Sequence, residues 1–268
     1  MYNQPASYRL ICIDVDGTLL DSRHELAPGV VEALDALRER GVLPVLASGR
    51  TRIGVDPLLQ RLNLGPAHIG GNGSYACGLD GEVLFTRPIP PDVLPTLLNR
   101  ARHENLGPAL HGIDATLLEG SAEHEQVLKN HNAGLACRVP DVLAAGMDCP
   151  LKVTLWGPAP ALEHFARWAR VEQLPVEMIF STAHFLEFNG LGVNKGAGVK
   201  TFAEALGIPL ERTMVVGDQF NDISMFSVAG LAVAMGNAPL DVQRAAHHVA
   251  PTNDAGGLSW AIHRYVLS

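Results

Sequence analysis

Two carboxylates, Asp14 and Asp16, directly follow the apolar run Leu10–Ile13, and Gly17 and Thr18 come next. An unbroken apolar run of this kind is typical of a strand that is buried on both faces of a parallel sheet. Two carboxylates at the end of a buried strand are costly unless they bind something. An acidic loop without a function is the alternative. Because ligands bind at the carboxyl ends of strands in open α/β sheets, the position favours a ligand site.

Further polar groups follow other expected strands or stand at the start of an expected helix: Ser48, Lys195, and Asp218 with Asn221 and Asp222. Each group has a structural alternative, such as a helix cap or a solvated lysine. For Ser48 or Lys195 alone the structural alternative is favoured. All of these groups together are difficult to explain as turns, so we expect them to form one site with Asp14 and Asp16.

The chemistry that this set predicts is phosphoryl transfer. Carboxylates together with an Asn amide offer the oxygen ligands that Mg²⁺ prefers. A Ser hydroxyl and a Lys ammonium can hold phosphate oxygens. One carboxylate can then attack phosphorus and form an aspartyl-phosphate, provided that a metal ion neutralises the charge that would otherwise keep two anions apart.

The elements that must position these groups alternate between strand and helix at both ends of the chain, which indicates a doubly wound α/β domain. The first strand, helix and strand form a right-handed βαβ unit, which places Ser48 beside Asp14 at one end of the sheet. From Glu82 the pattern changes to short strands and amphipathic helices. We therefore expect residues 82–188 to form a separate, inserted α+β domain, and residues 1–81 and 189–268 to form the core.

Composition excludes several classes of function. The formal net charge of the 268 residues is −8 and no basic stripe is visible, which argues against nucleic acid or an anionic membrane as the main partner. No apolar run reaches the roughly 18 residues that span a bilayer. The four cysteines are scattered without a CxxC pair, and the first ten residues lack the features of a signal peptide. We therefore expect a cytoplasmic protein; the sequence leaves its oligomeric state open.

Four segments resemble the motifs of the haloacid dehalogenase (HAD) superfamily: IDVDGTLLD (13–21), ASGR (47–50), NKGAGV (194–199) and GDQFND (217–222). More narrowly, the chain is similar to the Cof-type phosphatases, and the resemblance covers essentially the whole chain. It implies a Rossmann-like parallel sheet core with an α/β cap inserted after the third strand. The chain departs from the family pattern at Asn194, where many relatives have Ser, and at Asn189-Gly190, where a Pro is common.

The resemblance also implies roles for individual residues. Asp14 would be the nucleophile and Asp16 the general acid and base. Ser48, Gly49 and Lys195 would bind the transferring phosphoryl group.

By the same resemblance Mg²⁺ would be bound by Asp14, the backbone carbonyl of Asp16 and Asp218, and Asn221 and Asp222 would support it. Asn221 would also lie near the phosphate. Asn72, which follows the third expected strand, would contact the substrate phosphate or the hinge of the cap.

Elementary electrostatics predicts different protonation states and roles for the two N-terminal carboxylates, Asp14 and Asp16. Asp14, placed against Mg²⁺ and Lys195, should have a depressed pKa and remain an anion, as a nucleophile must. Asp16 would contact the metal only through its carbonyl. Its carboxyl would then be free to protonate the leaving oxygen and later to deprotonate water.

The inserted domain should close over the site, exclude bulk water and select the substrate. The candidate contacts are Arg87, His103, His111, His124 and His131, although an exposed structural role is favoured for each. We expect Trp156, Phe165 and Trp168 to form the core of the cap rather than a stacking platform.

The predicted function is a Mg²⁺-dependent phosphatase acting on small phosphorylated metabolites such as sugar phosphates. Two alternatives remain: a phosphomutase or phosphotransferase that uses the same intermediate, and a non-enzymatic phospho-aspartate signalling module. The large inserted domain and the Asp14/Asp16 pair argue against the signalling module.

Overall fold

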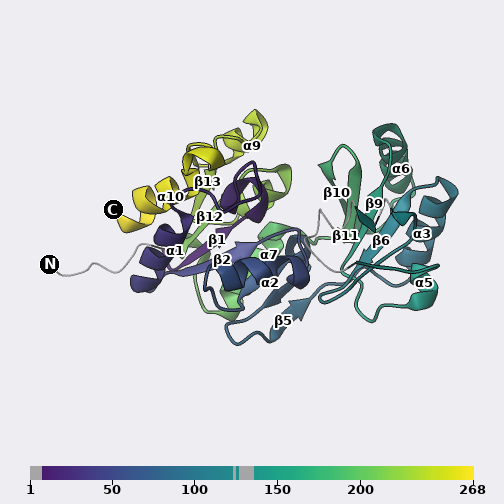
Figure 1. Cartoon of the computed structure of the whole chain (residues 1–268), viewed down its shortest axis with the longest axis horizontal. Helices are drawn as coiled ribbons and strands as arrows, with labels where there is room; N and C mark the ends of the chain where they lie inside the picture. Colours follow the sequence, from purple (N-terminus) through teal and green to yellow (C-terminus); the bar gives the residue numbers. More distant parts are fainter. Residues whose placement is uncertain (1–7, 123–124, 127–135) are drawn as a thin grey trace.

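The computed structural model describes residues 8–122, 125–126 and 136–268. The chain forms two lobes, each built on its own β-sheet, and Figure 1 shows them side by side with the C-terminus at the far end of the larger lobe. The strands of the larger sheet are β1 (Leu10–Ile13), β2 (Leu43–Ala47), β3 (His68–Gly70), β4 (Tyr75–Cys77), β5 (Val83–Thr86), β12 (Thr213–Gly217), β13 (Leu231–Ala234) and β14 (His248–Val249).

The order of strands in the larger sheet is β14-β13-β12-β1-β2-β3-β4-β5. The strands from β14 to β3 are parallel, whereas β4 and β5 are antiparallel additions. Strand β1 therefore lies inside the sheet between β12 and β2. All four residues of β1 are inaccessible to solvent, which confirms the expectation of a strand buried on both faces.

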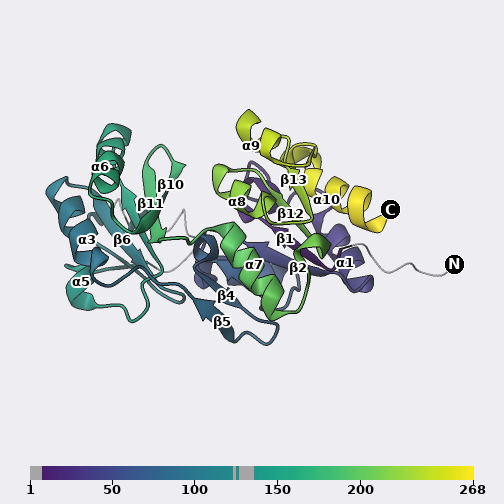
Figure 2. The same cartoon turned by 180° about the vertical axis from the view of Figure 1, so that it is seen from behind.

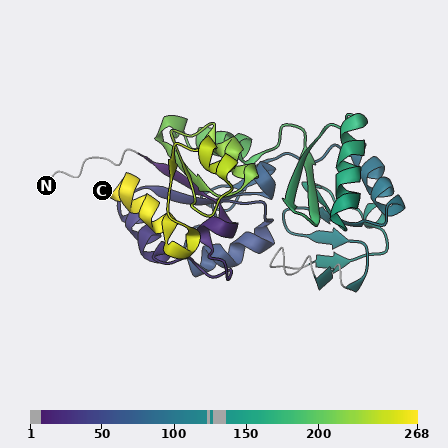
Figure 3. The same cartoon turned by 90° about the horizontal axis from the view of Figure 1, so that it is seen from above.

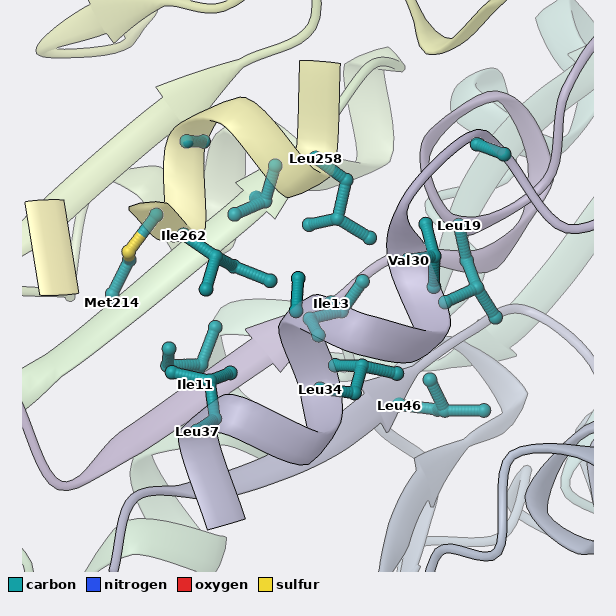
Figure 4. Close-up of a cluster of buried hydrophobic side chains, with 14 of the residues drawn as sticks. Ile11, Ile13, Leu19, Val30, Leu34, Leu37, Leu46, Met214, Leu258 and Ile262 are labelled. Atoms are coloured by element: carbon teal, nitrogen blue, oxygen red, sulfur yellow. The ribbon is translucent and has the colours of Figure 1, made fainter. Parts of the chain in front are cut away.

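Helices cover both faces of the larger sheet. One face packs against α1 (Val30–Glu39), α2 (Arg52–Arg61) and α10 (Gly257–Ile262). Figure 4 shows Ile11 and Ile13 of β1 among side chains of α1 and α10. The other face packs against α7 (Lys195–Ala205), α8 (Ile223–Phe226) and α9 (Leu240–Ala245). This two-sided cover is the expected doubly wound α/β architecture.

The smaller lobe is an α+β unit, as the sequence predicts. Its sheet has the order β10-β11-β9-β6-β7-β8. These strands are β6 (Gly107–His111), β7 (Thr116–Leu118), β8 (Ala136–Arg138), β9 (Lys152–Trp156), β10 (Val176–Thr182) and β11 (Phe185–Gly190). Its helices are α3 (Val93–His103), α5 (Val142–Ala145) and α6 (Ala159–Val171), and α3 and α6 lie on one face of the sheet (Figures 2 and 3).

The two sheets do not divide the chain at the expected residues. Strand β5 falls within our predicted cap range, but it pairs with β4 as the edge strand of the larger sheet. The reason is the tight turn at Gly78–Gly81, which folds the chain back onto β4 through a hydrogen bond from Gly78 N to Glu82 O. At the other end, β11 continues in the smaller sheet to Gly190. The assignment of residues 82–188 to the cap is therefore wrong at its two margins.

No helix in the described part of the chain is both long enough and apolar enough to cross a membrane.

Candidate active site

Strand β1 fixes the position of Asp14. The Asp14 amide donates a hydrogen bond of 3.0 Å to Val216 O of β12, so this residue is still held by the sheet. The chain then turns sharply through residues 15–19, with Gly17 at φ +85°. A Cβ atom on Gly17 would lie 2.3 Å from Asp218 Oδ2. Only a glycine therefore allows this turn to pass so close to Asp218.

Lys195, the first residue of α7, connects two of the carboxylates. Its ammonium donates hydrogen bonds of 2.5 Å to Asp14 Oδ1 and 2.6 Å to Asp222 Oδ1, and the side chain is almost completely buried. Asn194 is the N-cap of α7, because its Oδ1 accepts a hydrogen bond of 2.9 Å from Ala197 N. The departure from the family pattern at Asn194 therefore preserves the cap that positions Lys195.

Asp218 follows β12, the strand beside β1, and Asp222 lies one turn later. Asp222 Oδ2 accepts hydrogen bonds from the amides of Asp218 (2.8 Å) and Gln219 (2.9 Å), so Asp222 shapes the loop that presents Asp218. Asp218 Oδ1 accepts a hydrogen bond of 3.2 Å from Thr18 Oγ1. Carboxylate oxygens of Asp14, Asp218 and Asp222 all lie within 4.8 Å of one another.

Burial is the largest influence on the pKa of Asp14. Burial raises the pKa of the Asp14 carboxyl well above its ordinary value, and the neighbouring Asp222 and Asp218 add to this effect. Lys195 acts in the opposite direction without overcoming it. Our prediction of a depressed pKa concerned Asp14 against both Mg²⁺ and Lys195, and it stays a prediction for the metal-bound protein. With Lys195 alone, removal from water and repulsion between carboxylates outweigh one ion pair.

The neighbouring groups show the same crowding of negative charge. Burial, followed by repulsion from Asp222, raises the pKa of Asp218 to about 6. For Lys195, burial lowers the pKa, but the carboxylates of Asp14 and Asp222 raise it by more, so that the net pKa lies above its ordinary value. The ammonium therefore remains charged.

This donor set fits a divalent cation such as Mg²⁺. Its ligands would be hard oxygen atoms, and the raised pKa values of Asp14 and Asp218 show two buried carboxyls that a cation would stabilise as anions. Both oxygens of Asp222 already accept hydrogen bonds, from Lys195 and from two amides. Asp218 also accepts hydrogen bonds at both oxygens, but these are longer, at 3.2 Å from Thr18 and 3.3 Å from Gln219 and Asn237. Asp14 and Asp218 are therefore the better placed ligands, and Asp222 supports them.

Asp16 turns away from this cluster. Its carboxylate accepts two hydrogen bonds from the Arg50 guanidinium, from Nε to Oδ2 (2.9 Å) and from Nη2 to Oδ1 (2.5 Å), and its side chain is 49% exposed. We expected this carboxyl to be free of the metal site, and its side chain does lie outside the acidic cluster, but we did not predict that Arg50 holds it in a bidentate pair. Arg50 ends the ASGR segment, so the motif contained a signal that we did not use.

The other predicted phosphate-binding residues lie in neighbouring loops. Ser48 is buried, and its Oγ accepts a hydrogen bond of 3.1 Å from Arg50 N. Asn221 Nδ2 donates a hydrogen bond of 3.2 Å to Asn72 Oδ1. One cavity of about 780 Å³ is lined by six of the predicted site residues: Asp14, Asp16, Ser48, Gly49, Asn72 and Asn221.

The cap forms the opposite wall of this cavity through β9 and the hairpin of β10 and β11. The cap residues that line it are Lys152, Ile179, Phe180, Ser181, Thr182, Phe185 and Glu187. None of the described cap residues that we proposed as substrate contacts is among them. The cavity is therefore bounded by both lobes, as expected, but by different cap residues from those we predicted.

The proposed cap contacts have other partners. Arg87 Nη2 donates a hydrogen bond to Thr201 Oγ1 of α7 (2.5 Å), and His111 is buried between Thr116 and Thr154. His103 is exposed at the end of α3, and His124 and His131 lie outside the described residues. Phe165 is buried in an edge-to-face contact with Trp168, in agreement with the predicted cap core, whereas Trp156 is partly buried against a separate small cluster of the cap.

The sequence analysis missed a buried ion pair within the cap, and both of its residues also form hydrogen bonds with the core. Lys152 of β9 lies 3.2 Å from Glu187 Oε1 of β11, and both side chains are buried. Lys152 Nζ also donates a hydrogen bond of 3.0 Å to Gly49 O, and Asn72 Nδ2 donates one of 2.9 Å to Glu187 Oε2. Nearby, Asn189 Nδ2 donates to Gly71 O and Leu151 O. The available signal was a charged residue inside each of the apolar strands LKVTLW and FLEFNG.

Comparisons with known proteins agree with this fold. A family described as haloacid dehalogenase-like hydrolase matches residues 11–262. A pyridoxal phosphate phosphatase of Escherichia coli is 28% identical, covering 97% of this chain and 99% of its own. An HMP-PP phosphatase of Serratia proteamaculans is 29% identical, covering 86% of this chain and 85% of its own.

Among solved structures, a haloacid dehalogenase-like hydrolase from Bacteroides thetaiotaomicron superimposes with a TM-score of 0.88 at 30% identity, covering 96% of this chain and 99% of its own. The chain therefore belongs to the haloacid dehalogenase-like hydrolase family. Within that family it is a phosphomonoesterase.

Proposed function

We propose that this protein hydrolyses phosphomonoesters of small metabolites with the help of Mg²⁺, through an aspartyl-phosphate on Asp14. The observation that carries the proposal is the position of Asp14. It stands at the end of the central strand, is paired with the buried ammonium of Lys195 and opens into the cavity between core and cap. The named phosphatases among its relatives support small phosphorylated metabolites such as pyridoxal phosphate as the substrate class.

In the first step, Asp14 attacks the phosphorus atom, a bond forms between its oxygen and phosphorus, and the bond to the leaving oxygen breaks. Asp16 gives its proton to that leaving oxygen. Lys195 and Ser48 hold the phosphoryl oxygens during the transfer.

In the second step, water attacks the phosphorus of the aspartyl-phosphate while Asp16 takes a proton from it. The bond between phosphorus and Asp14 then breaks, and inorganic phosphate leaves. Between the two transfers the ionised Asp16 carboxylate accepts the bidentate contact from Arg50, which holds it at the cavity for the second proton transfer.

Asp14, Asp218 and the backbone carbonyl of Asp16 would hold Mg²⁺, with Asp222 and Asn221 in support. When bound, the ion supplies positive charge that offsets repulsion between the nucleophile and the phosphate. The cap closes the other side of the cavity and keeps bulk water from the phosphoryl group.

The decisive test combines turnover with detection of the intermediate. Phosphate release from a panel of small phosphorylated metabolites is measured with Mg²⁺ and with chelator, and radiolabelled acetyl phosphate is used to trap the phosphoenzyme. We expect Asp14→Asn to abolish both turnover and labelling. Labelling of Asp14→Asn at that position, or turnover unaffected by chelator, would contradict the proposal. Product analysis distinguishes release of phosphate from its transfer to a second hydroxyl.

A further inference from the structure

Two large aromatic side chains line the cavity and are nevertheless exposed. Phe180 lies on β10 of the cap with 42% of its surface accessible, and Phe220 lies in the core loop beside Asn221 with 58% accessible. Single exposed apolar residues are common on protein surfaces. Here, however, one such residue from each lobe lines the same cavity as Asp14, where a bound ligand would remove both from water.

The remaining apolar lining extends this surface. Ile179 and Phe185 contribute from the cap, and Leu20, Pro57 and Leu58 contribute from the core. Such a lining is typical of pockets that bury most of a small ligand and orient it with a few polar groups.

The charged and amide side chains that line the cavity already have protein partners. Arg50 binds Asp16, Lys152 binds Glu187 and Gly49 O, and Asn72 binds both Glu187 and Asn221. A polyhydroxylated sugar would have to compete with these contacts for its hydrogen bonds, and unpaired hydroxyl groups inside a cavity are unfavourable. A flat apolar group requires no such competition.

We propose that the substrate's leaving group carries a planar aromatic or heteroaromatic ring, which packs against Phe180 and Phe220, and that these two residues select ring-bearing phosphomonoesters over polyhydroxylated ones. The proposal rests on the proposed phosphatase activity and specifies its substrate class. Aromatic side chains favour this role because they combine a large apolar face with a preference for stacked or edge-to-face contacts with other rings.

The test compares three phosphate esters of primary alcohols, so that the bond that breaks is of the same kind: benzyl phosphate, cyclohexylmethyl phosphate and glucose 6-phosphate. For the wild-type protein we expect kcat/KM to be at least about tenfold higher for benzyl phosphate than for glucose 6-phosphate. Phe180→Ala and Phe220→Ala should each lower kcat/KM for benzyl phosphate about tenfold, mainly through KM, with a much smaller change for glucose 6-phosphate.

Two further variants test whether the aromatic ring itself is needed and whether the effect is confined to the cavity. Phe180→Leu keeps an apolar side chain without a ring, so it should lower the preference for benzyl over cyclohexylmethyl phosphate and still bind the latter. Trp260→Ala removes an aromatic that is 41% exposed but lies outside the cavity, and it should leave all three values unchanged.

Equal kcat/KM for the benzyl and glucose esters in the wild-type protein would overturn the inference. So would a loss in the Phe180 and Phe220 variants that is the same for every substrate. The wild-type comparison needs no variant, so misfolding of one variant leaves the inference testable. Failure to hydrolyse even acetyl phosphate with Mg²⁺ would instead refute the proposed function.

Discussion

Asn72 of the core donates a hydrogen bond of 2.9 Å to Glu187 of the cap, and through it the active-site loop is joined to a buried ion pair. Asn72 itself has a left-handed backbone, with φ +59°. Lys152, the partner of Glu187, reaches in the opposite direction to Gly49 O beside Ser48. Two core loops that line the same cavity as Asp14 are therefore held by one pair of cap residues.

Removing one member of this pair should destabilise the protein strongly. Glu187→Gln leaves the Lys152 ammonium buried without its counter-charge, which is expected to lower the free energy of unfolding by about 3–5 kcal/mol. Urea unfolding measures the change. A double variant, Lys152→Met with Glu187→Leu, should recover most of the loss because no charge remains buried.

The matched control for this pair is Glu163→Gln, which breaks an exposed contact with Arg167 on α6. It should change the free energy of unfolding by less than about 1 kcal/mol. A Glu187→Gln variant as stable as this control would show that the buried pair does not hold the lobes together.

Asp16→Asn should separate chemistry from metal binding. Loss of the proton donor and acceptor is expected to lower kcat by roughly 10²–10⁴. Mg²⁺ affinity, measured by calorimetry, should stay close to that of the wild-type protein, since the Asp16 carboxylate faces Arg50 rather than Asp14 and Asp218.

With acetyl phosphate, whose leaving group needs little help, the Asp16→Asn protein should accumulate the phosphoenzyme. Asp241→Asn, an exposed carboxyl on α9, serves as the control with normal turnover. Loss of Mg²⁺ binding in Asp16→Asn would argue that the Asp16 carboxylate itself binds the metal.

The turn at Gly17 can be tested with a matched pair of glycines. Gly17→Ala and Gly41→Ala both place a side chain at positive φ, +85° and +70°, which is expected to cost about 1–2 kcal/mol of stability in each. Only at Gly17 would the new methyl group meet Asp218; nothing lies within 4 Å of a Cβ at Gly41. Gly17→Ala alone should therefore weaken Mg²⁺ binding and lower turnover, and equal Mg²⁺ affinity in the two variants would refute this.

The raised pKa of Asp218 predicts a specific dependence on pH. The pKa is about 6 in the folded protein against an ordinary value of 3.8, so without metal the protonated group contributes stability that is fully present below about pH 4. This contribution is lost as the pH rises through about 6. The stability of the metal-free protein relative to Asp218→Asn should therefore fall over this interval.

Mg²⁺ should reverse this trend, because it binds the ionised carboxylate. Titration calorimetry in buffers of different ionisation enthalpy should show proton release on Mg²⁺ binding near pH 5.5 and less of it near pH 7.5. A proton release that is unchanged in Asp218→Asn would show that another group is responsible.

The sequence by itself determined the positions of Asp14, Lys195 and Asp218 relative to their own elements. An apolar run that ends in a carboxylate, or a helix that begins with an Asn-Lys pair, is set by local pattern, and parallel strands bring their carboxyl ends to one edge of the sheet. Asp14, Lys195 and the loop of Asp218 could therefore be expected together before any coordinates.

Only the tertiary structure decided what surrounds them. Three features depend on how segments far apart in the sequence pack together, which no local pattern specifies. These are the Arg50 contact with Asp16, the Lys152–Glu187 pair, and the exposure of Phe180 and Phe220. The same reason applies to the pKa of Asp14 in the protein without a cation. The sequence indicates which charges are near it, but the direction of its pKa shift depends on how completely the fold removes it from water.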